Sequence, residues 1–265
     1  PILVLAFERM DASFKENIDV VWFSTKENAE TEGLDGWLEG EEIVLRTNDD
    51  TKFRLAVQSI PLTLGGTALH NIQNAIAAGV VALKLGLPTS GILEGLNSLK
   101  PNVDDSRGRS NLYTVDNKYL LLDFAHNPGG LKMMAELSKR WPAGGRYFLM
   151  GQAGDRTTAL VEELAQEAVA IGLDHVVVKN LPKHSYERDP NEVAQGQVEA
   201  LYKAGQKEGS VTHVPDEVEA AEALIDMADE QSLIFLIAHE NVNGVMEMLV
   251  RRKAVLATLP DELTR

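Results

Sequence analysis

The chain has no cysteine among its 265 residues. Disulfide bonds and thiolate metal sites are therefore excluded, and so is a small secreted domain stabilised by disulfides. No apolar run approaches the roughly 20 residues that span a bilayer, and no basic-then-apolar signal sequence opens the chain. We therefore expect a soluble, cytoplasmic protein without a membrane partner.

Positive charge is also scarce. Lys and Arg number 25 against 40 Asp and Glu, which gives a formal net charge of −15. Affinity for nucleic acid comes largely from Lys and Arg that neutralise phosphates, so we expect no nucleic-acid partner. A small anionic ligand stays compatible with this charge, because a local cluster of donors can bind it. A homo-oligomer is left open.

The segment from residue 105 onward alternates apolar runs with helical patterns. Strands are expected at 119–124, 146–150, 175–179, 211–214 and 233–237, and helices at 131–140, 158–171, 191–204, 218–228 and 242–252. Strands that alternate with helices of this length predict a parallel sheet covered by helices. The predicted fold class is therefore α/β, with a doubly wound, Rossmann-like C-terminal domain.

Residues 1–104 show a different sequence pattern, with shorter apolar runs and more turn residues. Strands are expected at 1–7, 19–24, 42–45 and 53–57, and helices at 70–85 and 90–98. The last two strands form an antiparallel pair around the turn signal at 48–50. The polar segment at 100–105 marks a boundary, so we expect two domains, 1–104 and 105–265.

The loop after the first strand of the second domain contains Asp123, His126 and Asn127. Ligands of doubly wound sheets bind at the carboxyl ends of strands, where a carboxylate suits the hydroxyls of a ribose. A buried carboxylate is costly unless something pairs with it. The structural alternative is a strand-to-helix turn with Asn127 as the cap, Pro128 in the first helical turn and Asp123 as a satisfied buried acid.

The loop after the second strand reads GQAGDR over residues 151–156. Gly151 and Gly154 would let the backbone approach a ligand closely, and Asp155 and Arg156 suit contact with a phosphate or a carboxylate. The alternative is a surface turn closed by an Asp–Arg pair. The loop is not a dinucleotide-binding fingerprint, because it lacks the third glycine and follows the second strand.

Two other polar segments have two interpretations each. His70, Asn71 and Asn74 begin the first long helix, where amides suit a purine edge. The alternative is that Asn71 caps the helix and Asn74 bonds its neighbours. Arg107 and Arg109 flank a glycine and suit either an anion clamp or a solvated linker. No set of His, Asp and Glu shows a recognised metal-ligand spacing, so no metal site is expected from these residues.

Four motifs, in order along the chain, resemble the Mur ligase family. LGGTALHNIQNAIAA (64–78) is similar to the central-domain signature G-x-HN-x-x-NA-x-AA, and SRGRS (106–110) to the Gly-Arg that opens the C-terminal domain. LLDFAHNPGG (121–130) resembles the Asp-Tyr-Ala-His-Asn-Pro motif with Phe124 in place of Tyr, and GQAGDR resembles the Gly-x-x-Gly-Asp-Arg loop. These last two motifs, followed by HVVVKN, point to the cyanophycin synthetase branch. The resemblance covers roughly residues 1–252.

The resemblance implies both a fold and an activity. Residues 1–104 would be the C-terminal part of the central, ATP-binding domain, and 105–265 the Rossmann-like C-terminal domain. Ligases of this family use ATP and Mg²⁺ to convert a carboxylate into an acyl phosphate, which an amine attacks to form an amide bond. The implied partners are ATP and a small amino acid or peptide substrate.

The resemblance also implies roles for the residues that match the family motifs. His70, Asn71 and Asn74 would face the adenine, Arg109 would lie beside the nucleotide and Asp123 would hold the ribose. These side chains must then converge on one cleft of nucleotide size, although they come from distant parts of the sequence.

The remaining matched residues are implied to take part in catalysis and in binding the amine. His126 and Asn127 would line the catalytic cleft between the domains. The side that receives the incoming amine would be shaped by Gly151, Gly154, Asp155 and Arg156.

Two rival functions belong to other classes. The first is a stand-alone, non-catalytic Mur-like protein that binds a nucleotide or a partner; an in-frame phosphate loop encoded upstream would argue against it. The second is an unrelated α/β nucleotide-binding enzyme such as a dehydrogenase. This second rival is disfavoured, because no glycine-rich fingerprint follows the first strand of the second domain.

One part of the family's ATP site is missing from this sequence. No Gly-Lys dipeptide occurs in the chain, so the phosphate loop G-x-x-x-x-G-K-[ST] is absent, and the family's upstream Mg²⁺-binding acid and histidine are not matched. Without them, little holds the β and γ phosphates. We therefore expect the chain alone not to turn over ATP. Measurable ATP hydrolysis by the purified 265-residue chain would contradict this expectation.

Overall fold

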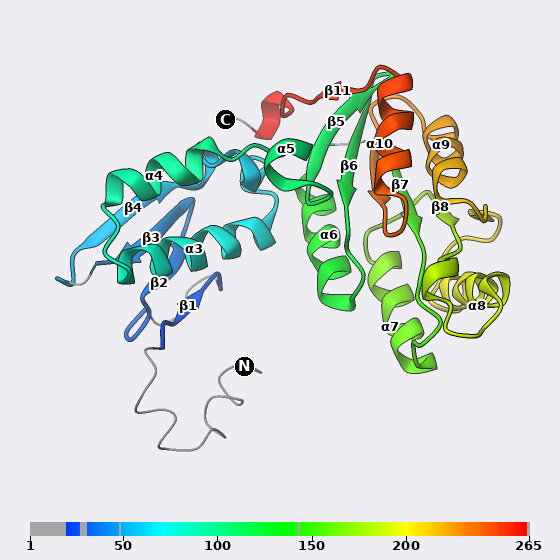
Figure 1. Ribbon diagram of the computed structural model, residues 1–265, viewed down its shortest axis with the longest axis horizontal. Helices are drawn as coiled ribbons and strands as arrows, with labels where there is room; N and C mark the ends of the chain where they lie inside the picture. The colour runs from blue at the N-terminus through cyan, green and yellow to red at the C-terminus, as the bar shows by residue number, and fades with distance from the viewer. Residues whose placement is uncertain (1–19, 27–30, 48, 143, 264–265) are drawn as a thin grey trace.

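Two β-sheets with their own helices are joined by a short helix, α5 (Val103–Ser106) (Figure 1). The computed structural model describes residues 20–26, 31–47, 49–142 and 144–263. α5 begins where the side chain of Asn102 accepts a hydrogen bond from the backbone N–H of Asp105. The proposed domain boundary, between residues 104 and 105, falls inside this helix.

The first sheet has the strand order β1-β2-β3-β4. Its strands are Phe23–Ser24, Gly36–Glu39, Glu42–Arg46 and Lys52–Ala56. The antiparallel pair predicted around residues 48–50 is present as β3 and β4. β2 was not predicted, because it has only four residues, begins with Gly36 and is followed directly by Gly40. The predicted strand at 1–7 lies outside the described residues.

Two helices cover one face of this sheet: α3 (Leu69–Lys84) and α4 (Thr89–Ser98). Apolar residues recur along α3 at helical spacing, and Ile72 and Ile76 pack against Ile43 of β3. Gly79 allows the close approach, since a Cβ there would lie 2.6 Å from Cδ1 of Leu45. This packing fixes the position of the N-terminal turn of α3.

The second sheet has the strand order β11-β5-β6-β10-β7-β8-β9. Its parallel part confirms the α/β prediction and consists of β6 (Lys118–Asp123), β7 (Arg146–Met150), β8 (His175–Val178), β9 (Val211–His213) and β10 (Leu233–Ile237). Two antiparallel strands that were not predicted extend one edge, β5 (Asn111–Val115) and β11 (Val255–Leu256). Asp116 and Asn117, both with positive φ, form the tight turn between β5 and β6.

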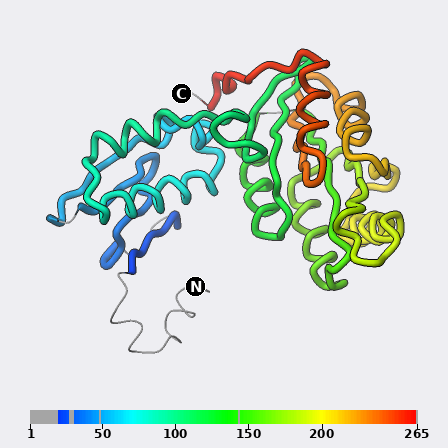
Figure 2. Tube along the Cα trace, in the orientation of Figure 1, coloured from blue at the N-terminus to red at the C-terminus, as the bar shows by residue number. Residues whose placement is uncertain are grey.

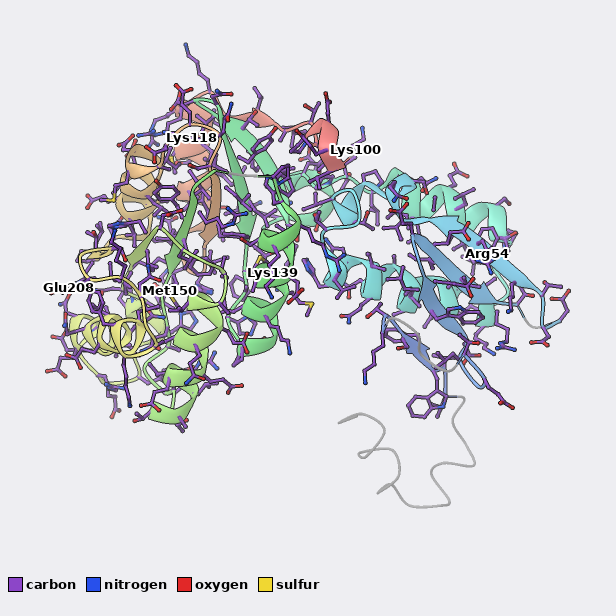
Figure 3. The ribbon with its side chains drawn as sticks, turned by 180° about the vertical axis from the view of Figure 1, so that it is seen from behind. Arg54, Lys100, Lys118, Lys139, Met150 and Glu208 are labelled. Atoms are coloured by element: carbon purple, nitrogen blue, oxygen red, sulfur yellow. The ribbon has the colours of Figure 1, made fainter. Side chains whose placement is uncertain are left out.

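Helices cover both faces of the second sheet, as a doubly wound fold requires. α6 (Pro128–Arg140), α7 (Thr158–Val169) and α8 (Pro190–Lys203) pack on one face, and α9 (Glu217–Met227) and α10 (Val242–Arg251) on the other. Neighbouring residues of one strand serve opposite faces: Phe235 packs towards α6–α8 and Leu236 towards α9 and α10. Seen from behind, Met150 lies inside this layered part of the molecule (Figure 3).

The order of the parallel strands creates a switch point. β10 lies between β6 and β7, which are consecutive in the chain. The chain therefore leaves β6 and β7 towards one face and β10 towards the other. The loops at the carboxyl ends of these strands separate there, and such crevices are where doubly wound sheets bind ligands.

The C-terminal segment returns towards the first sheet. After β11 it runs to a short 3₁₀ helix at Asp261–Leu263 (Figure 2). The carbonyl of Leu263 lies so close to Gly65 that a side chain at position 65 would collide with it. Over the part of the chain that the structure describes, no helix is both long enough and apolar enough to cross a bilayer.

The aromatic core of the second sheet gives a test of the fold. Phe235 is 0% exposed and its ring centroid lies 5.8 Å from that of Phe148. We expect Phe235→Ala to lower the free energy of unfolding, measured by urea denaturation, by about 3–5 kcal/mol. The control is Val250→Ala on α10, where the valine is 71% exposed and the change should stay within about 0.5 kcal/mol. Equal effects of the two substitutions would contradict the assignment of the core.

Candidate functional site

A cleft of about 520 Å³ lies between the two sheets, and we call it the inter-sheet cleft. Its polar lining comes from α3, from the segment before β5 and from the loop after β6. These residues are His70, Asn71, Asn74, Arg109, Ser110, Asp123, His126 and Asn127. The structure therefore brings together every residue that the sequence placed at the nucleotide or in the catalytic cleft.

Asp123 ends β6 at the floor of this cleft and is only 6% exposed. Its Oδ2 accepts hydrogen bonds from the backbone N–H of Ser110 at 2.8 Å and from the Ser110 hydroxyl at 3.2 Å. Its Oδ1 accepts one from the backbone N–H of Phe124 at 2.7 Å. The carboxylate is thus the satisfied buried acid of the structural alternative. It also keeps about one acceptor position for a ligand, since a carboxylate has about four such positions and these three hydrogen bonds use the others.

Ser110 connects Asp123 to the other sheet. Its Oγ lies 2.9 Å from Nε2 of His70 on α3. Because this hydroxyl donates to Asp123, it accepts from His70, so the proton of the imidazole is on Nε2. Burial lowers the pKa of His70, although the charge of Asp123 acts to raise it. No motif singled out Ser110, because its role depends on two partners that are distant in sequence.

Asn71 and Asn74 lie on the first two turns of α3. The prediction that Asn71 caps this helix is wrong, because the helix begins after Ala68. Asn71 donates from Nδ2 to the carbonyl of Leu62 at 2.7 Å, and its Oδ1 lies 3.5 Å from Nδ2 of Asn74. Asn71 is therefore fixed, whereas the exposed amide of Asn74 keeps most of its capacity for a ligand.

The two arginines before β5 have different surroundings. Arg109 places its guanidinium carbon 4.8 Å from the centroid of the Phe124 ring, within the range of a cation–π contact. Arg107 instead donates to the side chain of Asn243 on α10. Of the pair, Arg109 alone lines the cleft.

The loop after β6 separates the cleft from the interior of the sheet. His126 donates from Nδ1 to the carbonyl of Phe124 at 3.0 Å, which leaves Nε2 as the acceptor of a neutral ring. Asn127 accepts from the backbone N–H of Gly130 at 2.8 Å and caps α6, as the alternative predicted. The Phe124 ring packs edge-on against His126 and His239, with centroid distances of 5.3 and 5.0 Å.

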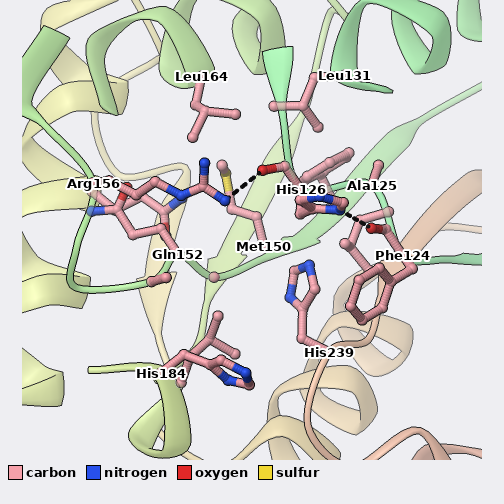
Figure 4. A pocket seen from close by; sticks show the side chains of 16 residues that line it. Phe124, Ala125, His126, Leu131, Met150, Gln152, Arg156, Leu164, His184 and His239 are labelled. Atoms are coloured by element: carbon pink, nitrogen blue, oxygen red, sulfur yellow. Dashed lines mark hydrogen bonds between the residues drawn. The ribbon is translucent and has the colours of Figure 1, made fainter. Parts of the chain in front are cut away.

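A second cavity, of about 130 Å³, lies behind Phe124 where the loops after β6, β7 and β10 meet (Figure 4). We call it the switch-point pocket. It shares Phe124, Ala125 and His126 with the inter-sheet cleft. The polar side chains of Arg156, His126, His184 and His239 line one part of it (Figure 4), and apolar side chains such as those of Leu131, Phe148 and Leu164 form most of its wall.

The 151–156 loop was predicted to shape the amine side, and only part of it lines the pocket. Gly151 and Arg156 do so, and Arg156 donates to the carbonyl of His126 at 3.2 Å. The close approach of Gly154 is to the backbone of Ser185 and not to a ligand, since a Cβ would collide there. Asp155 is exposed and lines neither cavity. The Asp155–Arg156 pair of the alternative interpretation is not among the ion pairs of the described residues.

A buried ion pair that the sequence did not reveal lies beneath the pocket. Lys179, at the carboxyl end of β8, contacts the carboxylate of Glu217 at the start of α9, and the two side chains are 0% and 5% exposed. Glu217 also accepts from the backbone N–H groups of His239, Glu240 and Asn241. Burial lowers the pKa of Lys179 to about 7, while the charge of Glu240 acts to raise it. In the sequence, Lys179 stood only within the segment HVVVKN, at the end of an apolar strand, and nothing indicated its partner.

Several polar atoms of the switch-point pocket have no protein partner. Among the described residues, Oε1 of Gln152, Oε1 of Gln197 and Nε2 of His239 are buried without a hydrogen bond. A buried polar atom without a partner costs about 1–3 kcal/mol, so this pocket is suited to a polar ligand. Within the described ranges no three His, Asp or Glu side chains are arranged to hold a metal ion.

Residues 108–239 match the family described as Mur ligase, glutamate ligase domain. The chain is 30% identical to cyanophycin synthetase of Synechocystis sp. over 197 residues, which are 74% of this chain and 22% of that protein. It is 32% identical over 110 residues, 40% of this chain, to 21% of the UDP-N-acetylmuramoyl-L-alanyl-D-glutamate–2,6-diaminopimelate ligase of Caldanaerobacter subterraneus. The chain thus spans about a fifth of the length of these relatives.

Solved structures show the same fold. The chain aligns with the MurF ligase of Thermotoga maritima in complex with ADP with a TM-score of 0.53 and 18% identity, over 91% of this chain and 52% of that one. It aligns with UDP-N-acetylmuramate-alanine ligase MurC of Thermotoga maritima with a TM-score of 0.57 and 17% identity, over 88% and 48% of the two chains.

His239 gives a prediction about stability and pH. Burial, followed by the neighbouring Lys179 charge, lowers the pKa of His239 to about 3. An unfolded histidine titrates near 6.5. Below that pH the unfolded chain binds a proton that the folded chain does not, so stability falls as the pH drops from about 6.5 towards 3. This residue contributes up to about 1.4 kcal/mol per pH unit in that window.

The measurement is urea denaturation between pH 4 and 7. We expect His239→Gln to lose less stability on acidification than the unsubstituted chain. The control, His213→Gln, replaces a part-buried histidine that contacts Asn180 and should keep the original pH dependence. Parallel curves for His239→Gln and the unsubstituted chain would show that His239 is not held neutral.

Proposed function

Since the chain belongs to the Mur ligase family through its glutamate ligase domain, we propose that it binds the nucleoside and the incoming amine in an ATP-dependent ligase. The ligase joins a carboxylate to the amine of an amino acid or peptide. The observation that carries this proposal is the convergence of Asn74, Arg109 and Asp123 on one cleft beside a second pocket. A transfer between two substrates requires two such adjacent sites.

The inter-sheet cleft suits a nucleoside. Asp123 accepts a hydrogen bond from a ribose hydroxyl at the acceptor position that Ser110 and Phe124 leave free. The amide of Asn74 binds the edge of the adenine, and Asn71 holds that amide in place. The flat face of the base packs against the apolar side chains that line the cleft, among them Leu96, Leu99 and Met133.

The described residues offer fewer contacts to the phosphates and the metal ion than to the nucleoside. Arg109 is exposed beside Phe124 and suits an oxygen of a phosphate. Among the described residues no three His, Asp or Glu side chains form a group that could hold a metal ion, and the contacts that we assign to this part of the chain are those to the nucleoside. When bound, ATP supplies the phosphoryl group that makes the carboxylate reactive. The missing phosphate loop is why we expect no turnover by this chain alone.

The switch-point pocket suits the amine substrate. In a chain of net charge −15, the pocket is lined by Arg156 and by three imidazoles. Arg156 is a hydrogen-bond donor for the carboxylate that an amino acid or peptide carries. Phe124 and the apolar wall restrict water, which would otherwise compete with the amine.

His126 lies between the two cavities and is our candidate for proton transfer. Its Nδ1 proton is committed to the carbonyl of Phe124, so the neutral ring can accept a proton at Nε2 as the amine attacks. Asn127 has a structural task as the cap of α6. Its remaining amide hydrogens can bind a substrate oxygen on the cleft side.

A calorimetric titration with ADP tests the nucleoside site. We expect Asp123→Asn to weaken ADP binding about tenfold, because hydrogen bonds to a charged group contribute about 1.5–3 kcal/mol. Removing the ribose hydroxyls by using 2′,3′-dideoxy-ADP should weaken binding to the unsubstituted chain and have little further effect on the variant. The control, Asp226→Asn, changes an exposed carboxylate on α9 that pairs with Arg252 and should bind ADP normally.

Two results would count against this site. One is equal ADP affinity of Asp123→Asn and the unsubstituted chain. The other is an equal effect of the dideoxy ligand on both. A thermal unfolding curve of each variant separates lost binding from lost folding.

The amine pocket is tested with free amino acids and their α-carboxamides. We expect an amino acid that binds the chain to lose at least fivefold in affinity when its carboxylate becomes an amide, because the donors at the opening lose a charged acceptor. Arg156→Gln should remove most of this preference. The control is Arg251→Gln at the exposed end of α10. An unchanged preference in Arg156→Gln would exclude Arg156 from the site.

A further inference from the structure

The loop between β10 and α10 is fixed by a single buried carboxylate. Glu217 accepts from the backbone N–H of His239 at 2.7 Å, from that of Glu240 at 3.0 Å and from that of Asn241. Lys179 contacts the same carboxylate from the end of β8. If the loop moved, the buried carboxylate of Glu217 would lose these hydrogen bonds, which costs free energy. His239 is held at one position beside the switch-point pocket.

The imidazole of His239 has different surroundings at its two nitrogens. Nδ1 lies 3.5 Å from Nζ of Lys179, inside the protein. Nε2 is buried and forms no close hydrogen bond in the described structure, although a backbone contact with Ala125 acts to raise the pKa of His239. His239 lines the switch-point pocket. The Phe124 ring packs edge-on against the imidazole at 5.0 Å and restricts its rotation.

The chemistry of lysine decides where the proton of this ring lies. An ammonium group has three donors and no acceptor. Contact with Glu217 favours this form, and with a pKa of about 7 Lys179 is mainly an ammonium group below that pH. Nδ1 of His239 must then accept, which leaves the single proton of the neutral ring on Nε2. A positive charge so close to the ring also opposes its protonation, in agreement with the lowered pKa of His239.

We propose that Lys179 is a positioning residue that holds His239 as the neutral Nε2–H tautomer, so that the switch-point pocket offers a hydrogen-bond donor to an anionic oxygen of its ligand. The inference deepens the proposed function, because it states what His239 recognises in the amine pocket: an acceptor such as a carboxylate oxygen. The ring keeps this polarity as long as Lys179 is charged and the imidazole is uncharged. His239 would otherwise divide its proton between two tautomers and offer the ligand an acceptor for part of the time.

The alternative arrangement does not suit the surroundings. A proton on Nδ1 would point towards the ammonium group of Lys179, with two donors facing one another. The pocket would then receive a lone pair from Nε2. The neighbouring His126 and His184 also act to lower the pKa of His239, which disfavours a positive charge on its ring.

The test is ¹⁵N NMR of the histidine rings in the free chain at pH 6, without nucleotide or amino acid. At this pH Lys179 is mainly an ammonium group and His239 is neutral, because their pKa values are about 7 and about 3. Long-range ¹H–¹⁵N correlations distinguish a protonated ring nitrogen from an unprotonated one, and the spectrum of His239→Asn identifies the resonances of His239. We expect Nε2 to be protonated and Nδ1 unprotonated. In Lys179→Met, we expect at least one third of the population to shift to the Nδ1–H tautomer.

A double variant separates the effect on the tautomer from a loss of folding. Lys179→Met leaves the Glu217 charge buried without its partner, which is destabilising. The double variant Lys179→Met with Glu217→Gln removes both charges and should show the same shift of tautomer. The control is Lys203→Met, where the lysine is 72% exposed and pairs with Glu162 on the surface. It should leave the His239 signals unchanged.

Each result decides the proposal. An Nδ1–H or a doubly protonated ring in the unsubstituted chain would overturn it, and so would a pure Nε2–H ring in both Lys179 variants. The readout needs no ligand. Its failure is therefore distinct from a failure of the proposed function, which the ADP and amino acid titrations measure.

Discussion

The insertion of β10 between β6 and β7 is the constraint on which both cavities depend. Parallel strands end at the same edge of the sheet, and here three neighbouring ends send their chains to opposite faces. The loop after β6 consequently lies between two spaces, the inter-sheet cleft and the switch-point pocket, and Phe124, Ala125 and His126 form the wall that they share. The central position of β10 also places His239, which follows it, against Phe124, which follows β6.

Two buried carboxylates make this arrangement specific. Asp123 and Glu217 are 6% and 5% exposed, and burying a carboxylate is unfavourable unless hydrogen bonds or a cation compensate for the lost water. Asp123 is compensated by Ser110 and Phe124, and through Ser110 it is connected to His70 on the helix of the other sheet. Glu217 is compensated by Lys179 and by backbone N–H groups of the β10–α10 loop. Each carboxylate thus fixes one wall of a cavity, which is where a binding site requires rigidity.

Prediction from sequence succeeded where the physics is local. The spacing of apolar residues located the helices and the parallel strands of the second sheet, because burial of one face dictates the period. It missed β2 and β11, which are short, and β5, whose buried Leu112, Tyr113 and Val115 are interrupted by Thr114. In the sites, the motif residues from His70 to Asn127 were found, and they line one cleft. Lys179, Glu217, His239 and Ser110 were not singled out, since each is a single polar residue whose partners are distant in the chain. Gly154 was found, but its close neighbour is Ser185 and not a ligand.

The sequence by itself determined the α/β class, the alternation of strands and helices, and the family motifs, because these follow from the order and spacing of residues along the chain. Only the tertiary structure decided which strands are neighbours, that the motif residues meet in one cleft with a second pocket behind it, and how the polar side chains are paired. The physical reason is that a hydrogen bond or an ion pair between side chains depends on distances of about 3 Å. The fold, and not the linear sequence, brings residues 70, 110 and 123, or 179, 217 and 239, to that separation.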